Sequence, residues 1–219
     1  MTEILRLVDR LHGPRVVELR LEGNAIVTTH GPLAGPHQHS RVEYPDAAEA
    51  KRAAARRLHS LTRVGYELGD QHPGLIARIA AAPDEVEHYL VYADWLLERG
   101  DPRGELIRVM EALERWPVNL ELELRRAELW EQHELRFSRP GWVDLDLRWR
   151  WGFVESLRVG LAFVSGARRT TYGNWLESAI MSVFRHPSGR FVRRLRAGEQ
   201  VFALRPDAHG RPLVLERLG

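Results

Sequence analysis

Three histidines, His30, His37 and His39, are the residues of this chain whose type and spacing best suit a metal. Imidazole nitrogens are frequent ligands of zinc, so three of them close together could hold an ion. The segment that carries them, "HGPLAGPHQH", is also rich in glycine and proline, which is typical of a solvated loop. We favour the loop and predict no metal and no cofactor.

Nucleophilic catalysis has no recognisable set of residues in this sequence. The chain contains no cysteine, and neither a Gly-x-Ser-x-Gly nor a Walker A motif occurs. Paired carboxylates such as Glu121 and Glu123 fit a solvated helix face better than acid–base catalysis. We therefore predict that the protein is not an enzyme.

An acidic residue stands inside the apolar stretch "VYADWLLERG". Asp94 lies beside Trp95, and Glu98 follows about one helical turn later. A carboxylate buried without a partner is costly, so Asp94 should bind Arg103 or Arg108 of the segment that follows. The favoured interpretation is that Asp94 joins two helices. The alternative is that Asp94 and Glu98 form an acidic notch that binds a basic partner.

Basic residues are concentrated near the C-terminal end, where Phe184 and Phe191 are interleaved with them. The arginines are Arg185, Arg190, Arg193, Arg194 and Arg196. Such a mixture could contact the phosphates of nucleic acid. The favoured alternative is an exposed arginine face, with Phe191 in the core.

Composition limits the class of protein. The chain has 219 residues, of which 44% are hydrophobic and 28% charged, as in a folded protein. No apolar run approaches the roughly 18 residues of a membrane span, and "MTEILRLVDR" lacks a secretory signal, so we expect a cytoplasmic protein without membrane contact. Residues 71–140 carry 9 basic and 14 acidic residues, whereas residues 141–219 carry 13 and 7. This asymmetry predicts attraction between domains or two different partner surfaces.

The elements that position these residues begin with short strands. "RVVELRLEG" alternates apolar and polar residues, Gly23 and Asn24 predict a turn, and "AIVTTH" returns the chain. After the loop and the strand "SRVEY", a helix should begin at Asp46, with Glu49 completing a capping box. Its inward residues should be Ala50, Ala54, Leu58 and Leu61.

This order of strands, glycine loop, strand and helix resembles the WGR domain over residues 4–69. In that family a Trp-Gly-Arg loop meets a DNA end. The aligned residues here are His30, Gly31 and Pro32, so only the glycine matches. The resemblance implies a small β-rich domain and makes His30 a candidate contact residue. Whether this loop still binds DNA is left open.

Residues 74–137 should be helical. A first helix ends at Pro83, and Asp84 could cap the second. On the second helix, apolar residues form two stripes, so we expect it to be clamped between two neighbours. The first stripe is Val86, Leu90, Ala93 and Leu97, widened by Tyr89 and Leu96, and the second, nearly opposite, is Val91, Tyr92 and Trp95. A third helix should run from about 119 to 137 with Leu120, Leu124, Ala127 and Leu135 inward.

The turn between the second helix and the next is short. Gly100 fits a left-handed C-terminal cap, Asp101 an N-cap, and Pro102 the first helical turn. The motif "YADWLLERGDPRGE" resembles the repeat-companion domain, which usually precedes leucine-rich repeats. Its matching or structural residues here are Tyr92, Ala93, Asp94, Trp95, Leu96, Arg99, Gly100, Asp101, Pro102, Arg103, Gly104 and Glu105. The resemblance implies a family and no reaction.

The last segment reads as strand, turn at Gly152, strand, helix and strand, followed by a hairpin around residues 207–212. A helix over 172–187, with Trp175 among its apolar residues, would separate the strands. This order resembles the entry unit of a leucine-rich-repeat array. No 20–29-residue period recurs, so a solenoid is not predicted.

The sequence thus predicts an α+β protein of three modules: a WGR-like domain over residues 1–70, a helical repeat-companion domain over 71–140, and a leucine-rich-repeat-like unit over 141–219. We expect a noncatalytic adaptor that binds another protein. The alternative is a nucleic-acid-binding regulatory protein. Candidate partner-binding residues are Asp94, Glu98, His30, Arg193, Arg194 and Arg196.

Overall fold

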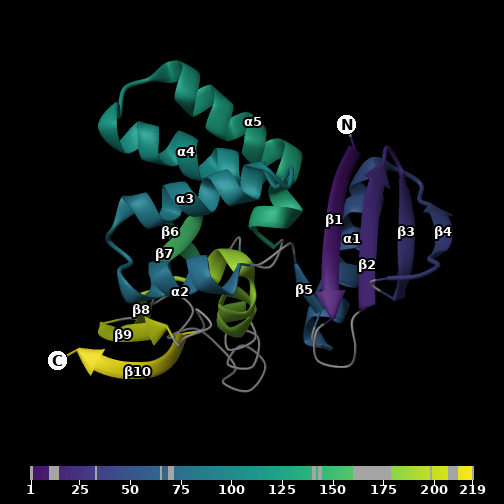
Figure 1. Ribbon diagram of the computed structural model, residues 1–219. Helices are drawn as coiled ribbons and strands as arrows, with labels where there is room; N and C mark the ends of the chain where they lie inside the picture. Colours follow the sequence, from purple (N-terminus) through teal and green to yellow (C-terminus); the bar gives the residue numbers. More distant parts are fainter. Residues whose placement is uncertain are drawn as a thin grey trace. The chain divides into compact units, whose positions relative to one another are not determined.

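The protein is α+β and contains two five-stranded sheets. The computed structural model describes residues 2–9, 15–32, 34–64, 66–68, 72–139, 142, 145–159, 179–197, 199–206 and 212–218 (Figure 1). The chain divides into two compact units. Unit 1 comprises Met1–Asp70 and Trp130–Arg136, and unit 2 comprises Gln71–Leu129 and Phe137–Gly219.

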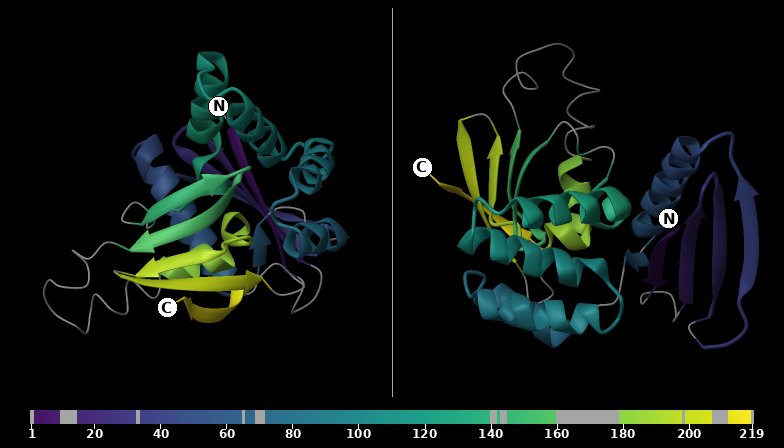
Figure 2. Two further views of the ribbon diagram at one scale, coloured as in Figure 1. Left: turned by 90° about the vertical axis from the view of Figure 1, so that its left-hand side faces the viewer. Right: turned by 90° about the horizontal axis from the view of Figure 1, so that it is seen from above.

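Unit 1 is an antiparallel sheet covered on one face by a helix (Figures 1 and 2). Its elements are β1 (Thr2–Asp9), β2 (Arg15–Glu22), β3 (Ala25–Pro32), β4 (Gln38–Glu43), α1 (Ala47–Arg63) and β5 (Tyr66–Leu68). The strand order is β4-β3-β2-β1-β5, so β5 returns to pair with the first strand.

Local sequence signals explain these elements. The apolar residues of β2 are buried, and Gly23 turns the chain into β3 with a φ of 61°. Asp46 caps α1, as predicted, because its carboxylate accepts a 2.7 Å hydrogen bond from the backbone N–H of Glu49. The four predicted inward residues of α1 are all buried: Ala50, Ala54, Leu58 and Leu61.

A segment from much later in the chain completes this core. Leu135 is 1% exposed and packs with the buried residues of α1 and the first sheet. Arg136 donates a 2.8 Å hydrogen bond to the carbonyl of Ile4, and Lys51 forms an ion pair with Glu134. Unit 1 is therefore built from two separate stretches of sequence.

In unit 2, the second sheet follows helices α2 (Pro73–Ala81), α3 (Val86–Leu97) and α4 (Pro102–Arg115) and most of α5 (Leu120–Phe137), which has a kink at His133. The strands are β6 (Asp146–Arg150), β7 (Phe153–Val159), β8 (Arg194–Ala197), β9 (Gln200–Pro206) and β10 (Pro212–Leu218). The sheet order is β10-β9-β8-β7-β6, and β7 and β8 are parallel while the other described pairs are antiparallel.

The predicted strand–helix–strand connection is present between β7 and β8. Residues 179–185 are helical, and a short 3-10 turn, η2 (Pro187–Gly189), leads toward β8. Trp175 of the predicted helix lies outside the described residues. The final hairpin is also formed, by β9 and β10.

The second unit joins segments that the sequence analysis placed in separate modules at residues 71–140 and 141–219. Tyr92 of α3 stacks on Phe153 of β7 at 6.3 Å, and Tyr89 contacts Phe191 at 5.7 Å. These rings belong to one core cluster with residues of α2 and α4. Because helices and sheet share this core, the compact units differ from the predicted boundary at residue 140.

The buried face of α3 is also different from the predicted stripes. α3 packs against α2 and α4, as predicted. Its buried residues are Tyr89, Tyr92, Ala93 and Leu96, whereas Val91 and Leu97 are exposed. The four buried residues were all predicted to lie in apolar stripes, and the prediction is wrong only for Val91 and Leu97. The packing neighbours decide which residues of a largely apolar helix are buried.

The inward face predicted for α5 is wrong over its first half. Leu120, Leu124 and Ala127 are exposed, whereas Leu129 is buried. Arg125 bonds to α4, and at about 100° per residue positions 125 and 129 lie opposite 120, 124 and 127. α5 is therefore rotated so that Arg125 lies toward α4 and these leucines lie in solvent.

Among the described helices, none has the length and the apolar character required to cross a membrane.

Candidate functional site

The turn between α3 and α4 has the geometry that its sequence predicts. Gly100 has a φ of +66°, and the N–H of Asp101 donates to the carbonyl of Leu96 at 2.9 Å, as in a Schellman cap. The carboxylate of Asp101 accepts a 2.9 Å hydrogen bond from the N–H of Arg103, and Pro102 begins α4. The two helices are consequently joined by a minimal turn and run back along each other (Figure 1).

Gly104 is where α3 and α4 approach most closely within the motif. A Cβ atom at this position would lie 2.5 Å from the carbonyl oxygen of Ala93 and 2.8 Å from the side chain of Leu97. Neither distance is possible for a real Cβ atom, and the first involves a backbone atom that cannot move aside. The glycine is therefore required by helix packing.

Arg103 is buried and does not bind Asp94. It is 4% exposed, and its Nη1 donates a 2.6 Å hydrogen bond to the carbonyl of Gly152 in the β6–β7 turn. Its guanidinium also lies 5.2 Å from the ring centroid of Phe153 and 5.4 Å from that of Phe137. Arg103 thus connects α4 to the second sheet.

Asp94 instead pairs with Arg108, the other predicted partner. Its Oδ1 accepts hydrogen bonds from Nε of Arg108, at 3.1 Å, and from Nη2. Both side chains are 55% exposed, so the expectation that Asp94 is buried is wrong: its position on α3 faces away from the core. Glu98 is 74% exposed and lies 3.6 Å from Arg99. The two carboxylates are accessible, but both have arginine neighbours.

Replacing Asp94 with Ala is expected to reduce the free energy of unfolding by less than about 1 kcal/mol, because exposed ion pairs contribute little. Urea denaturation of the wild type, Asp94→Ala, Arg108→Ala and the double variant would give the coupling energy of the pair. A coupling above about 2 kcal/mol would show that this pair is a principal support of the hairpin.

Trp95 is partly buried at the side of α3. Its ring meets the ring of His72 edge-on at 5.4 Å and stacks on Tyr92 at 5.9 Å. The guanidinium of Arg99 lies 4.0 Å from the Trp95 ring centroid, and Arg99 also donates to the Trp95 carbonyl. These contacts account for Trp95 by packing against α2 and its own helix.

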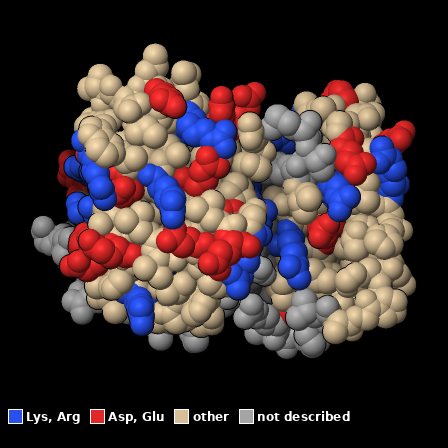
Figure 3. All heavy atoms as spheres, turned by 45° about the horizontal axis from the view of Figure 1, so that its top comes forward, with Lys and Arg blue, Asp and Glu red and all other residues tan. Residues whose placement is uncertain are grey.

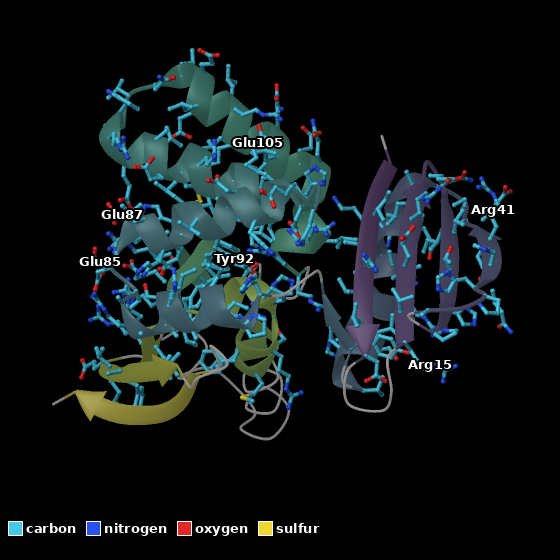
Figure 4. The ribbon with its side chains drawn as sticks, in the orientation of Figure 1. Arg15, Arg41, Glu85, Glu87, Tyr92 and Glu105 are labelled. Atoms are coloured by element: carbon cyan, nitrogen blue, oxygen red, sulfur yellow. The ribbon has the colours of Figure 1, made fainter. Side chains whose placement is uncertain are left out.

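Tyr92 and Glu105 have separate structural roles at the two ends of the motif. Figure 4 shows Tyr92 directed into unit 2, and its burial raises the pKa of the phenol. Glu105 forms a forked pair with Arg125 of α5, with N···O distances of 2.6 and 3.0 Å, and these hydrogen bonds raise the pKa of Arg125. Glu105 therefore attaches α5 to the hairpin.

A histidine that the sequence analysis did not single out lies in the interior of unit 2. His186 is 2% exposed, and its Nδ1 accepts a 3.1 Å hydrogen bond from the N–H of Ser188. Its Nε2 is buried and has no hydrogen-bond partner in the described part of the chain. Burial, together with the charges of Arg139, Arg103 and Arg190, lowers the pKa of His186 well below 6.5. His186 is thus held neutral among cations.

Arg193, one of the predicted partner-binding residues, forms hydrogen bonds with other residues of unit 2. Its Nη1 donates to Asp84 at 2.7 Å and its Nη2 to the carbonyl of Pro83 at 2.9 Å. Arg150 donates to the same carboxylate at 3.1 Å. The hydrogen bond from Arg193 is the main cause of the lowered pKa of Asp84. Asp84 does not cap α3; Glu85 occupies that position without a side-chain bond.

Arg194 and Arg196 are exposed on β8, and Phe191 is in the core, as favoured from the sequence. The strand register places Arg194 beside Ser156 and Arg196 beside Arg158 of β7. Arg148 of β6 is in register with Ser156. We call these four residues the outer arginine face: Arg148, Arg158, Arg194 and Arg196. Arg148 and Arg158 were not predicted as site residues, although the alternation in "DLRWRW" and "FVESLRV" indicated that they share a strand face with polar neighbours.

The histidine group near the start of the chain does not converge. His30, Gly31 and Pro32 belong to β3 and not to a loop, because β3 pairs with β2 up to Pro32. His37 and His39 each bond to a different residue of β3, at 2.9 and 3.0 Å. No group of three metal-binding side chains is found in the described ranges.

Four large apolar side chains are exposed where α4 passes into α5. Trp116 is 58% exposed, Val118 100%, Leu120 74% and Leu124 57%, and we call them the apolar strip. On the face of the molecule shown in Figure 3, acidic and basic side chains are interspersed. Asp94 and Glu98 each have an arginine neighbour, whereas the apolar strip stands out by its exposure.

Comparison with known proteins gives little guidance. No protein-family model and no curated protein matches the chain. A crystal structure of a Bacteroides fragilis protein aligns with 32% of this chain and 20% of its own chain, at 18% sequence identity and a TM-score of 0.29. The aligned part thus spans a fifth of that structure, and a similarity at this level supports no conclusion about fold or function.

Proposed function

We propose that this chain is a noncatalytic protein-interaction or adaptor protein that binds another protein in the cytoplasm through the apolar strip. The exposure of the strip carries this proposal, since exposed apolar patches on folded proteins commonly mark binding surfaces. Fully burying an exposed apolar side chain contributes about 1.5–3 kcal/mol, and correspondingly less for Trp116 and Leu124, which are already partly buried. Trp116 also belongs to the residue type most enriched among energetically dominant interface residues.

The roles of the motif residues support the same proposal. Gly100, Asp101 and Gly104 shape the turn and the helix contact, Arg103 joins the sheet, and Glu105 holds α5. The motif is the basis for proposing that the middle of the chain is a repeat-companion domain. The order of strands and helix in unit 1 is the basis for proposing that unit 1 is WGR-like. The motif would then build the scaffold that presents the apolar strip.

An affinity experiment on matched variants tests the proposed surface. Purified wild type and a Trp116→Ser/Leu120→Ser variant are used as baits in a lysate of the source organism, with nuclease added, and bound proteins are quantified by mass spectrometry. The control, Val42→Ser/Val91→Ser, alters two side chains that are 49% and 50% exposed elsewhere. We expect specific partners to be lost from the first variant and kept by the control.

Two results would contradict the proposal. An identical set of bound proteins on all three baits would show that the apolar strip is not the contact. Turnover of a substrate by the purified chain, abolished by a point substitution, would contradict a noncatalytic function.

A further inference from the structure

The outer arginine face gathers four cations from three strands on one side of the second sheet. Ser156 and Arg158 of β7 pair with Arg194 and Arg196 of β8, and β6 adds Arg148. The intervening positions, Leu157 and Leu195, are buried on the opposite side of the sheet. The period-two alternation of the strands therefore turns these arginines away from the core and toward solvent.

Three of the four arginines are not used within the described structure. Arg158, Arg194 and Arg196 are exposed, and no ion pair joins them to a carboxylate among the residues whose side chains the structure describes. Arg148 does pair with Glu155, at 3.1 Å. One acidic residue, Asp146, is in register with Arg158 at the edge. Three of the four guanidinium groups are thus exposed to an anionic partner, with Asp146 beside one of them.

The spacing of these arginines suits a chain of phosphates. Alternate residues of a strand are about 6.6 Å apart, and neighbouring strands about 4.8 Å apart. A strand of nucleic acid carries one phosphate for about every 3.4 Å of helix axis, so two or three phosphates fall within reach of the three side chains. Each guanidinium can also contact a phosphate through two parallel hydrogen bonds.

The remainder of the face argues against a folded acidic protein. Apart from Asp146, the described neighbours of the arginines across the sheet are small: Ser156, Ala203 and Val201. Protein interfaces depend on large apolar or aromatic anchors, and stacking of bases also needs rings. A face with guanidinium groups and small side chains offers contacts to a charged backbone without reading bases.

We infer that the outer arginine face binds the phosphodiester backbone of nucleic acid, without preference for base sequence. This surface is distinct from the apolar strip, and the inference does not depend on the proposed protein partner.

Fluorescence anisotropy with labelled single-stranded and duplex oligonucleotides tests this inference. Three phosphate contacts correspond to a loss of affinity of about 40-fold between 50 and 200 mM salt, because log K falls by about 0.9 per contact per decade of salt. The wild type should show at least this dependence. The Arg158→Gln/Arg194→Gln/Arg196→Gln variant should bind at least about 40-fold more weakly at 50 mM salt and lose most of the salt slope.

The matched control is Arg52→Gln/Arg56→Gln/Arg57→Gln, which removes the same charge from exposed positions on α1. It should bind as the wild type does, and circular dichroism should show both variants folded. Equal weakening in both triple variants would assign binding to net charge and overturn the inference, as would no binding at 50 mM salt. Polyglutamate peptide and unlabelled DNA are also compared as competitors of the labelled oligonucleotide. If the peptide displaced it as efficiently, per charge, as the DNA does, the face would be assigned to an acidic protein and the inference would be overturned.

Discussion

Replacing Gly104 with alanine is expected to destabilise the protein by about 3 kcal/mol, near the upper end for one added methyl group in a packed interior. The new Cβ atom would lie 2.5 Å from the backbone oxygen of Ala93, and α3 would have to move away from α4. That movement would disturb the rings of Tyr92 and Phe153, which share the core of unit 2. The measurement is the free energy of unfolding from urea denaturation.

Two other glycines provide controls for this expected loss. At Gly74, a Cβ would meet only the His72 ring at 3.4 Å, so Gly74→Ala should be neutral or slightly stabilising in helix α2. At Gly100, the space is open but φ is +66°, so Gly100→Ala should cost about 1–2 kcal/mol through the backbone alone. If Gly104→Ala were no worse than Gly74→Ala, the close contact between α3 and α4 would not exist in solution.

The stability of unit 2 is expected to fall in mild acid because of His186. Its pKa is lowered in the folded protein from 6.5 by burial and by Arg139, Arg103 and Arg190. Below pH 6.5 the unfolded chain therefore takes up a proton that the folded chain does not, which favours unfolding. The loss should be about 1.4 kcal/mol for each pH unit between 6.5 and the lowered pKa, and this stability is fully present above pH 6.5.

The pH dependence, and not the stability at one pH, identifies His186 as the cause. A His186→Asn variant should be less stable at neutral pH but should lack most of the slope between pH 6.5 and 4.5, whereas His37→Gln should keep it. The carboxylate of Asp84 also has a lowered pKa, but its contribution is lost only below its usual value of 3.8. Equal slopes for the wild type and His186→Asn would refute the assignment.

Features determined by a few consecutive residues could be predicted from the sequence. The N-cap at Asp46, the left-handed Gly100 and the cap at Asp101 each depend on backbone geometry within three to five residues. The strand character of β2 followed from simple alternation. The α+β class followed from the succession of such elements. The short turn predicted that Asp94 would bind an arginine of the next helix, either Arg103 or Arg108, and Arg108 is its partner.

Features that depend on how elements face one another could not be predicted in the same way. The rotation of α5 places Arg125 beside Glu105, which lies 20 residues earlier on another helix. Arg103 binds the carbonyl of Gly152, 49 residues away, and this long-range contact was not visible in the sequence. Without it, Arg103 and Arg108 were equally good candidates as the partner of Asp94. The outer arginine face depends on the register of β7 and β8, whose connection spans more than 30 residues. Alternation indicates which residues share a face of one strand, but not which strand lies beside it.

The return of residues 130–136 to unit 1 has a consequence for how such a chain can evolve and be engineered. The polypeptide enters unit 2 after Asp70, comes back at Trp130 and leaves again after Arg136. A gene fragment that stops at residue 70 would encode a sheet without Leu135, one of its least exposed core residues. The two units should therefore not fold well when one is exchanged without the other. A recombinant that keeps unit 1 folded should carry the intervening helices together with the N-terminal sheet.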